Sequence, residues 1–76
     1  MKEILETILR NLVENPDQIQ ITETENEKEI VLEVKVAEVD MGRVIGRQGK
    51  VASSIRTIMK SIAGKEKKKI TVEFIG

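Results

Sequence analysis

The segment with the clearest chemical potential holds two glycines three residues apart, Gly46 and Gly49, with Arg47 between them and Lys50 directly after them. Glycine lacks a Cβ, so it adopts dihedral angles that other residues avoid and lets another backbone approach closely. Gly49 also precedes an expected helix, whose free amides and macrodipole favour an anion. A basic residue such as Lys50 in a first helical turn opposes that dipole. These features together indicate a site for an anionic ligand.

Two common nucleotide-binding motifs do not fit this segment. A phosphate-binding P-loop requires a glycine where the chain has Val44, and a serine or threonine where it has Val51. The dinucleotide fingerprint requires glycines two and then three residues apart, whereas Gly42, Gly46 and Gly49 are four and three apart. The remaining interpretations are a plain helix–helix turn and an anion-binding turn, and the neighbouring basic residues favour the second.

The composition argues against catalytic and metal chemistry. The sequence contains no Cys and no His, which removes thiol catalysis, histidine general bases, disulfides and Cys/His zinc sites. Ser53, Ser54 and Ser61 have no histidine to activate them, so we expect no enzyme. Four alternating glutamates between positions 23 and 29 fit a charged, solvated turn better than a metal site. We therefore expect no catalytic residue, no bound metal and no cofactor.

The length and hydropathy predict one small domain over residues 1–76. The chain is 39% hydrophobic and 34% charged, and a domain of this size buries only about 60% of the surface that its unfolded chain exposes. No apolar run approaches the roughly 18 residues of a membrane span, and no signal-peptide core follows Met1. We expect a soluble, cytoplasmic binding module without membrane association.

The formal net charge of zero hides a division between the two halves of the chain. Residues 1–40 carry four basic and eleven acidic side chains, whereas residues 41–76 carry nine basic and two acidic ones. Such asymmetry is typical of a chain that binds a polyanion or a charged partner, although the two halves could also attract one another in the fold. The lysine-rich run over 65–69 fits a solvated loop, with an extension of the basic surface as the alternative.

Hydrophobic periodicity predicts an α+β fold with the element order α-β-β-α-α-β. The first helical pattern must stop at Asn15-Pro16, because a residue before proline avoids the helical region. Asp40 is expected to cap a short helix and Gly64 to end a longer one. The expected elements are a helix of about three to four turns before position 15, strands over 19–22 and 30–37 around a polar turn at 25–28, helices over 41–45 and from 50 onward, and a strand over 70–74.

The Gly46-x-x-Gly49 loop, with apolar residues before it and at helical spacing after it, resembles the loop of KH domains, which clamps about four nucleotides of a single strand. The apolar residues that carry this likeness are Val44, Ile45, Val51, Ile55 and Ile58. The element order is similar to the type II KH arrangement, a three-stranded sheet with helices packed on one face. More narrowly, the run over 40–50, Ala52 and Ile55-Arg56-Thr57 are similar to the small bacterial stand-alone KH proteins of the KhpA type.

The resemblance implies a groove for single-stranded RNA, with single-stranded DNA as an alternative ligand. Its floor would be aliphatic, which suits a chain with one aromatic residue. By position, the loop residues that would clamp the phosphates are Gly46, Arg47, Gln48 and Gly49. The groove would be lined by Ile45 and Ala52. Its rim would be formed by Arg43, Lys50, Ser53 and Arg56.

The resemblance also implies partners and cellular roles. KhpA-type proteins are associated with homodimers and with pairing to a larger KH-containing protein of the Jag type. The family is linked to RNA chaperoning, post-transcriptional regulation, and the control of cell shape and cell-wall growth. The competing hypothesis is a KH-fold interaction module that dimerises and binds no RNA. Because such modules usually lose a loop glycine or gain an acid there, Gly46, Arg47, Gly49 and Lys50 favour RNA binding.

Overall fold

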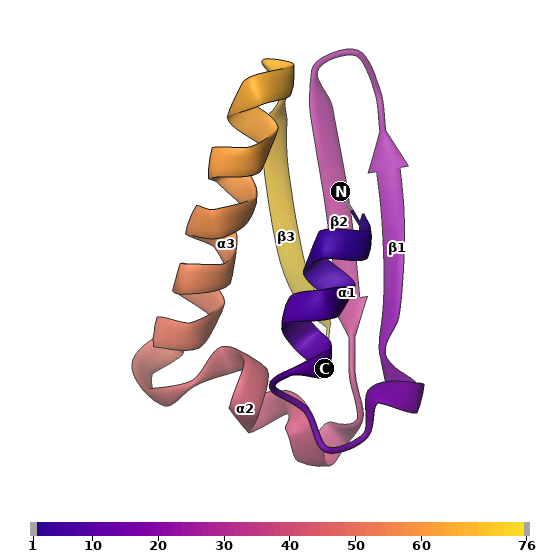
Figure 1. Ribbon diagram of the computed structural model, residues 1–76, viewed down its shortest axis with the longest axis vertical. Helices are drawn as coiled ribbons and strands as arrows, with labels where there is room; N and C mark the ends of the chain where they lie inside the picture. The colour runs from indigo at the N-terminus through magenta and orange to yellow at the C-terminus, as the bar shows by residue number, and fades with distance from the viewer. Residues whose placement is uncertain (1, 76) are drawn as a thin grey trace.

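A computed structural model describes residues 2–75, apart from the side chain of residue 66 (Figure 1). Within these residues, three helices and three strands follow one another as α1 (Lys2–Arg10), β1 (Gln20–Glu25), β2 (Glu29–Lys35), α2 (Met41–Ile45), α3 (Lys50–Ala63) and β3 (Lys69–Ile75). Short 3₁₀ turns connect them at Pro16–Gln18, Glu38–Asp40, Arg47–Gly49 and Gly64–Glu66. The observed order confirms the predicted α-β-β-α-α-β arrangement. No helix within residues 2–75 is long and apolar enough to cross a membrane.

The three strands form one mixed sheet in the order β1-β2-β3. β1 and β2 are an antiparallel hairpin, whereas β2 and β3 run parallel. Asn26 closes the hairpin, since its side-chain Oδ1 accepts the amides of Lys28 and Glu29, each at 2.8 Å. The parallel pairing requires a long crossover from β2 to β3, and α2 and α3 provide it. The crossover places the two-glycine turn between α2 and α3, toward one end of the molecule (Figure 1).

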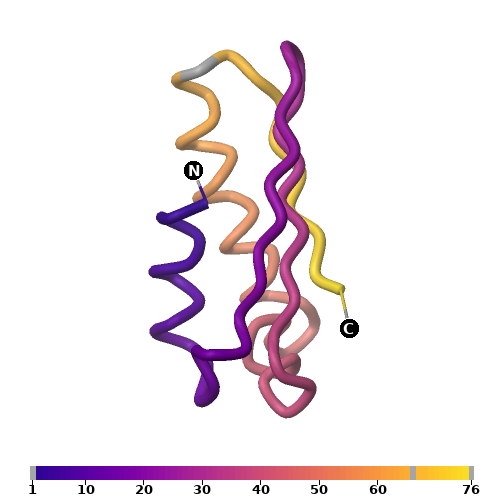
Figure 2. The backbone as a smooth tube through the Cα atoms, turned by 90° about the vertical axis from the view of Figure 1, so that its right-hand side faces the viewer, coloured from indigo at the N-terminus to yellow at the C-terminus, as the bar shows by residue number. Residues whose placement is uncertain are grey.

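Both longer helices cover the same face of the sheet, as expected (Figure 2). Alternate strand residues point toward them, because successive side chains of a strand face opposite sides. The buried core joins residues from both layers: Leu5 and Leu9 of α1, Ile55, Met59 and Ala63 of α3, and Ile21, Ile30, Leu32, Val34, Ile70 and Val72 of the strands. Within residues 2–75, no helix covers the opposite face of the sheet (Figure 2).

The first helix is shorter than its apolar pattern predicts. The pattern extends to Val13, but α1 ends at Arg10. The side-chain amide of Asn11 donates to the Thr7 carbonyl at 2.7 Å, which is the acceptor that a continuing helix would use for the Asn11 backbone. The backbone N–H of Asn11 instead donates to the Ile8 carbonyl, three residues earlier, at 3.2 Å. The chain therefore leaves the helix before the proline that was expected to stop it.

Asp40 does not cap the helix that follows it, contrary to the prediction. α2 begins directly after Asp40, but the carboxylate makes no capping bond there. It is fully buried and accepts three hydrogen bonds from the loop after α1: from the Glu14 amide at 3.0 Å, the Asn15 amide at 3.0 Å and the Asn15 side chain at 3.1 Å. Asp40 thus fastens the start of α2 to a segment 25 residues earlier in the chain.

The hydrogen bond from the Glu14 amide is the main cause that lowers the pKa of Asp40 below its ordinary value, and Asn15 and the nearby Arg43 charge act in the same direction. Burial opposes them, since it penalises the charged carboxylate. Because the pKa is lowered on folding, the ionised carboxylate stabilises the folded state above the usual aspartate pKa of about 3.9. This stabilisation is lost as the pH falls through the lowered value.

We predict that Asp40→Asn lowers the melting temperature at pH 7, because an amide group has one acceptor atom where the loop presents three donors. The difference from the parent should shrink below about pH 3.9. Thermal unfolding followed by circular dichroism between pH 7 and pH 3 checks both points. The exposed Asp17→Asn is the matched control and should change little. Equal stability of Asp40→Asn and the parent at pH 7 would contradict the clamp.

Candidate nucleic-acid interface

The turn between α2 and α3 has three residues with positive φ. Gly46 has φ 76° and ψ 173°, Gln48 has φ 58° and ψ 25°, and Gly49 has φ 74° and ψ 13°. The turn is held by backbone bonds from the Gly46 amide to the Gly42 carbonyl at 2.9 Å and from the Gly49 amide to the Gly46 carbonyl at 3.2 Å. The chain thus reverses direction tightly and starts α3 without a side-chain cap.

Gly46 is required by the fold itself. A Cβ at this position would lie 2.4 Å from Cγ2 of Val51 and 2.8 Å from its backbone nitrogen. In addition, its φ and ψ fall in a region that is essentially restricted to glycine. The close packing of Gly46 against Val51 therefore joins the end of α2 to the first turn of α3.

Gly49 has a different environment. A Cβ there would meet nothing within 4 Å, so open space lies above this residue. It precedes α3, a helix of fourteen residues whose first amides lack carbonyl acceptors within the helix. Open space over a helix N-terminus without a side-chain cap is suited to an anion that approaches the backbone closely.

The exposed loop tip and first turn of α3 bring five predicted residues together. Arg47, Gln48, Lys50 and Ser53 are exposed, and Gly49 lies between them at the helix start. Two of them are basic, and α3 contains no acidic residue over its whole length. This cluster combines positive charge with open space at the start of α3, where the Gly49 and Lys50 amides donate to the Gly46 and Arg47 carbonyls and no side chain caps the helix.

Ile45 and Ala52, which were both expected to line the groove, differ from each other in exposure. Ile45, the last residue of α2, is half-buried and packs against the core, so part of its side chain is accessible. Ala52 is only 2% exposed, because it lies on the face of α3 that packs inward. Its methyl group supports the surface from beneath, and we leave it out of the contact set proposed below.

Arg43 is paired with the loop after α1 and with Asp40. Its Nη2 lies 2.6 Å from Oε1 of Glu14, and its Nε lies 3.9 Å from Oδ1 of Asp40. Two carboxylates therefore offset its charge, which makes it a structural cation in this conformation. The sequence gives no sign of this pairing, because Glu14 is 29 residues away.

Arg56 is anchored at the edge of the sheet. Its Nε donates to the Val72 carbonyl at 3.1 Å, and its guanidinium carbon lies 5.5 Å from the ring centroid of Phe74. Both contacts are with β3, so the Arg56 side chain reaches from α3 to the edge of the sheet. Val72 and Phe74 thus contact a candidate site residue, which the sequence pattern did not predict; the only available signal was that Phe74 is the sole aromatic residue.

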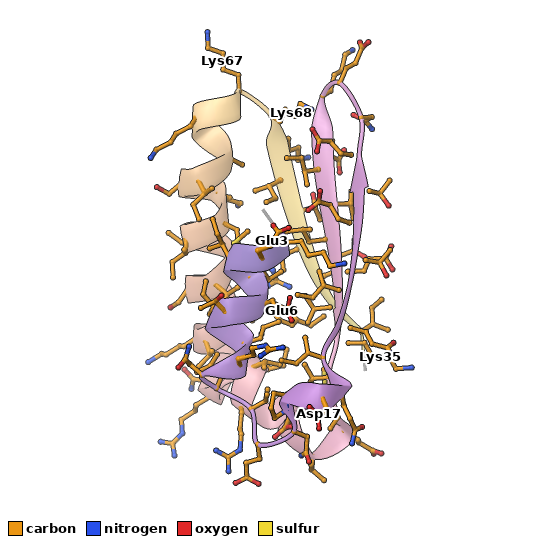
Figure 3. All side chains as sticks on the ribbon, turned by 45° about the vertical axis from the view of Figure 1, so that its right-hand side comes forward. Glu3, Glu6, Asp17, Lys35, Lys67 and Lys68 are labelled. Atoms are coloured by element: carbon orange, nitrogen blue, oxygen red, sulfur yellow. The ribbon has the colours of Figure 1, made fainter. Side chains whose placement is uncertain are left out.

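The lysine run over 65–69 is divided by the fold. Lys68 forms an ion pair with Glu25 at the tip of the hairpin, whereas Lys67 lies in the loop with φ 59° and points away from the sheet (Figure 3). Lys69 borders a hollow of about 170 Å³ between α3 and β3, which is also lined by Arg56, Lys60, Ile70, Thr71 and Val72. The run is therefore divided between the hairpin, which Lys68 contacts, and the hollow beside β3, which Lys69 borders.

The two turn glycines should respond differently to substitution. Gly49→Ala adds only left-handed strain, about 1–2 kcal/mol, because its Cβ meets open space. Gly46→Ala adds strain together with the overlap on Val51, so it should destabilise the fold more. Urea unfolding of both variants measures the difference. Equal losses, or a larger loss for Gly49→Ala, would contradict the assignment of Gly46 to the fold.

Comparison with known proteins agrees with the geometry. Residues 2–74 match the family model described as KhpA/KhpB, KH domain. RNA-binding protein KhpA of Clostridium acetobutylicum is 52% identical over 75 residues, which cover 99% of this chain and 100% of that protein. The KhpA proteins of Caldanaerobacter subterraneus subsp. tengcongensis and Aquifex aeolicus are 48% and 39% identical, each over 99% of this chain and over 100% and 95% of their own. The chain has the type II KH-like α+β fold and belongs to the KhpA/KhpB KH-domain family.

Proposed function

We propose that this protein binds single-stranded RNA and clamps its backbone with the turn Gly46-Arg47-Gln48-Gly49. The observation that carries the proposal is the open space over Gly49 at the uncapped start of α3, directly beside exposed Arg47 and Lys50. Relatives that align with nearly the whole chain are named RNA-binding proteins, which supports RNA as the ligand. Single-stranded DNA is the alternative that a competition experiment would test.

The phosphate contact follows from the backbone. An RNA phosphate over Gly49 accepts hydrogen bonds from amides at the start of α3, where the macrodipole is favourable. Arg47 and Lys50 add charge-assisted contacts from either side. Gly49 lets the phosphate approach because no Cβ covers the amides, whereas Gly46 fixes the direction of the loop. Gly49 therefore serves ligand binding, and Gly46 serves the fold.

The bases lie toward the half-buried Ile45 and the edge of β3. A residue's N–H and C=O point to the same side of a strand, and the Val72 carbonyl faces Arg56. The polar backbone groups of Val72 therefore face the groove and not β2, which gives them a role in contacting base edges. Stacking on an aromatic ring is the usual alternative in RNA-binding modules, but Phe74 is covered by Arg56 here.

The proposed contact set is thus Ile45, Gly46, Arg47, Gln48, Gly49, Lys50, Ser53 and Arg56. Arg43 and Ala52 are omitted because the first is paired with carboxylates and the second is buried. A homodimer, a Jag-type partner, RNA chaperone activity and a role in cell shape or cell-wall growth stay predictions from the family resemblance. The exposed apolar residues Ile4, Val39, Ile58 and Ile75 lie on four different elements.

The direct test replaces the loop tip. Arg47→Asp combined with Gln48→Asp places two negative charges where phosphate would lie, and aspartate tolerates the left-handed conformation of position 48. Both side chains are exposed, so the fold should persist. We expect fluorescence anisotropy with a labelled single-stranded RNA pool to show at least a tenfold loss of affinity, with circular dichroism unchanged.

A matched control changes the same amount of charge elsewhere. Gln18→Asp with Lys35→Asp alters two exposed residues near the β1–β2 side of the sheet, where Lys35 points away from α3 (Figure 3). This variant should bind RNA like the parent. If the loop variant also binds like the parent, the RNA lies elsewhere on the surface. If the parent itself binds neither RNA nor DNA, the interaction-module hypothesis replaces the proposal.

A further inference from the structure

A basic stripe on α3 leads away from the turn. Ser53, Arg56 and Lys60 follow Gly49 at spacings of four, three and four residues, which places them on one face of the helix. All three side chains are exposed. Between positions 41 and 65 the sequence has six basic residues and no acidic one. The α3 stripe, defined as Ser53, Arg56 and Lys60, therefore receives no neutralising carboxylate from its own helix.

The far end of the α3 stripe borders the hollow beside β3. Arg56 uses its Nε for the Val72 carbonyl, which leaves its two Nη groups for a ligand. Lys60 forms no ion pair among the side chains that the structure describes. Lys69 is less free, because Glu29 is its partner in the sheet register and also accepts a hydrogen bond from Thr71. Lys60 is thus the cation at this end whose charge is least offset.

We propose that a bound RNA strand continues past the turn along the α3 stripe, so that a phosphate beyond the four clamped nucleotides contacts Lys60. This inference rests on the proposed function and extends its footprint. The occupant is the same RNA strand, because the stripe is continuous with the loop cluster and has the same sign of charge. The hollow between α3 and β3 receives the nucleotide that follows Arg56.

The distance along the helix sets the length of RNA required. Ten residues separate Lys50 from Lys60, which corresponds to about 15 Å along the helix axis. A stacked strand rises about 3.4 Å per nucleotide, so about four further nucleotides span this distance. At physiological salt the Debye length is about 8 Å, so Lys60 has little influence on a phosphate held at the turn. An RNA of four nucleotides, held between the turn and Arg56, should sense Lys60 only weakly, whereas an RNA of eight nucleotides should contact it directly.

The test compares two RNA lengths with two charge reversals. Dissociation constants are measured by fluorescence anisotropy at about 0.15 M salt for random-sequence RNAs of four and eight nucleotides. The proteins are the parent, Lys60→Glu and the control Lys35→Glu, an equal charge change on β2. We expect the ratio of the Lys60→Glu and parent dissociation constants to stay below about twofold for four nucleotides and to reach about fivefold or more for eight. An RNA of eight nucleotides offers more positions at which the protein can bind, but this factor is the same for the parent and the variant and cancels in their ratio.

A neutral variant guards against a folding defect. Lys60→Gln should show a smaller, length-dependent loss in the same direction, and Lys35→Glu should stay near the parent at both lengths. A Lys60→Glu ratio that is equal at both lengths, or matched by Lys35→Glu, overturns the extended track while leaving the turn proposal in place. Absence of binding by the parent at both lengths overturns the proposed function and this inference together.

Discussion

The glycine-only backbone conformation of Gly46 is the constraint on which the candidate site depends. Because Gly46 packs directly against Val51, the end of α2 and the start of α3 are held at one fixed distance. Gln48 and Gly49 follow in left-handed conformations, and α3 begins directly after them without a side-chain cap. The chemistry at the turn is therefore a consequence of a packing contact, and the ligand-facing glycine can remain unhindered.

The two oppositely charged halves of the chain serve different purposes in the fold. Acidic residues of the first half meet basic residues of the second at specific points, as in the pairs of Glu14 with Arg43 and of Glu25 with Lys68. Asp40 adds a further link, because its carboxylate accepts a hydrogen bond from the Glu14 amide in the loop after α1. Among the described side chains, Arg47, Lys50, Arg56 and Lys60 form no ion pair and lie on α3 and its preceding turn, which contain no acid. A neutral chain thus acquires a positive surface on one side.

The period of the apolar residues was sufficient to predict the element order, and the glycine spacing was sufficient to locate the turn. Side-chain competition was not predictable from these patterns: Asn11 ends α1 early, and Asp40 bonds to the loop at Asn15 instead of capping α2. For the same reason Arg43 and Arg56 looked equivalent as rim residues. One is paired with the distant carboxylate of Glu14 and the other is ordered against β3, and both differences depend on contacts between residues far apart in the sequence.

The central claim is that RNA lies over the start of α3. The most direct measurement is a titration of ¹⁵N-labelled protein with a four-nucleotide RNA, followed residue by residue through amide chemical shifts. The account predicts the largest shifts at the amides from Gly46 to Ser53, with smaller ones at Arg56 and Val72, and little change along β1. Shifts centred on β1, or on the loop around Lys67, with the amides of the turn unchanged, would contradict it.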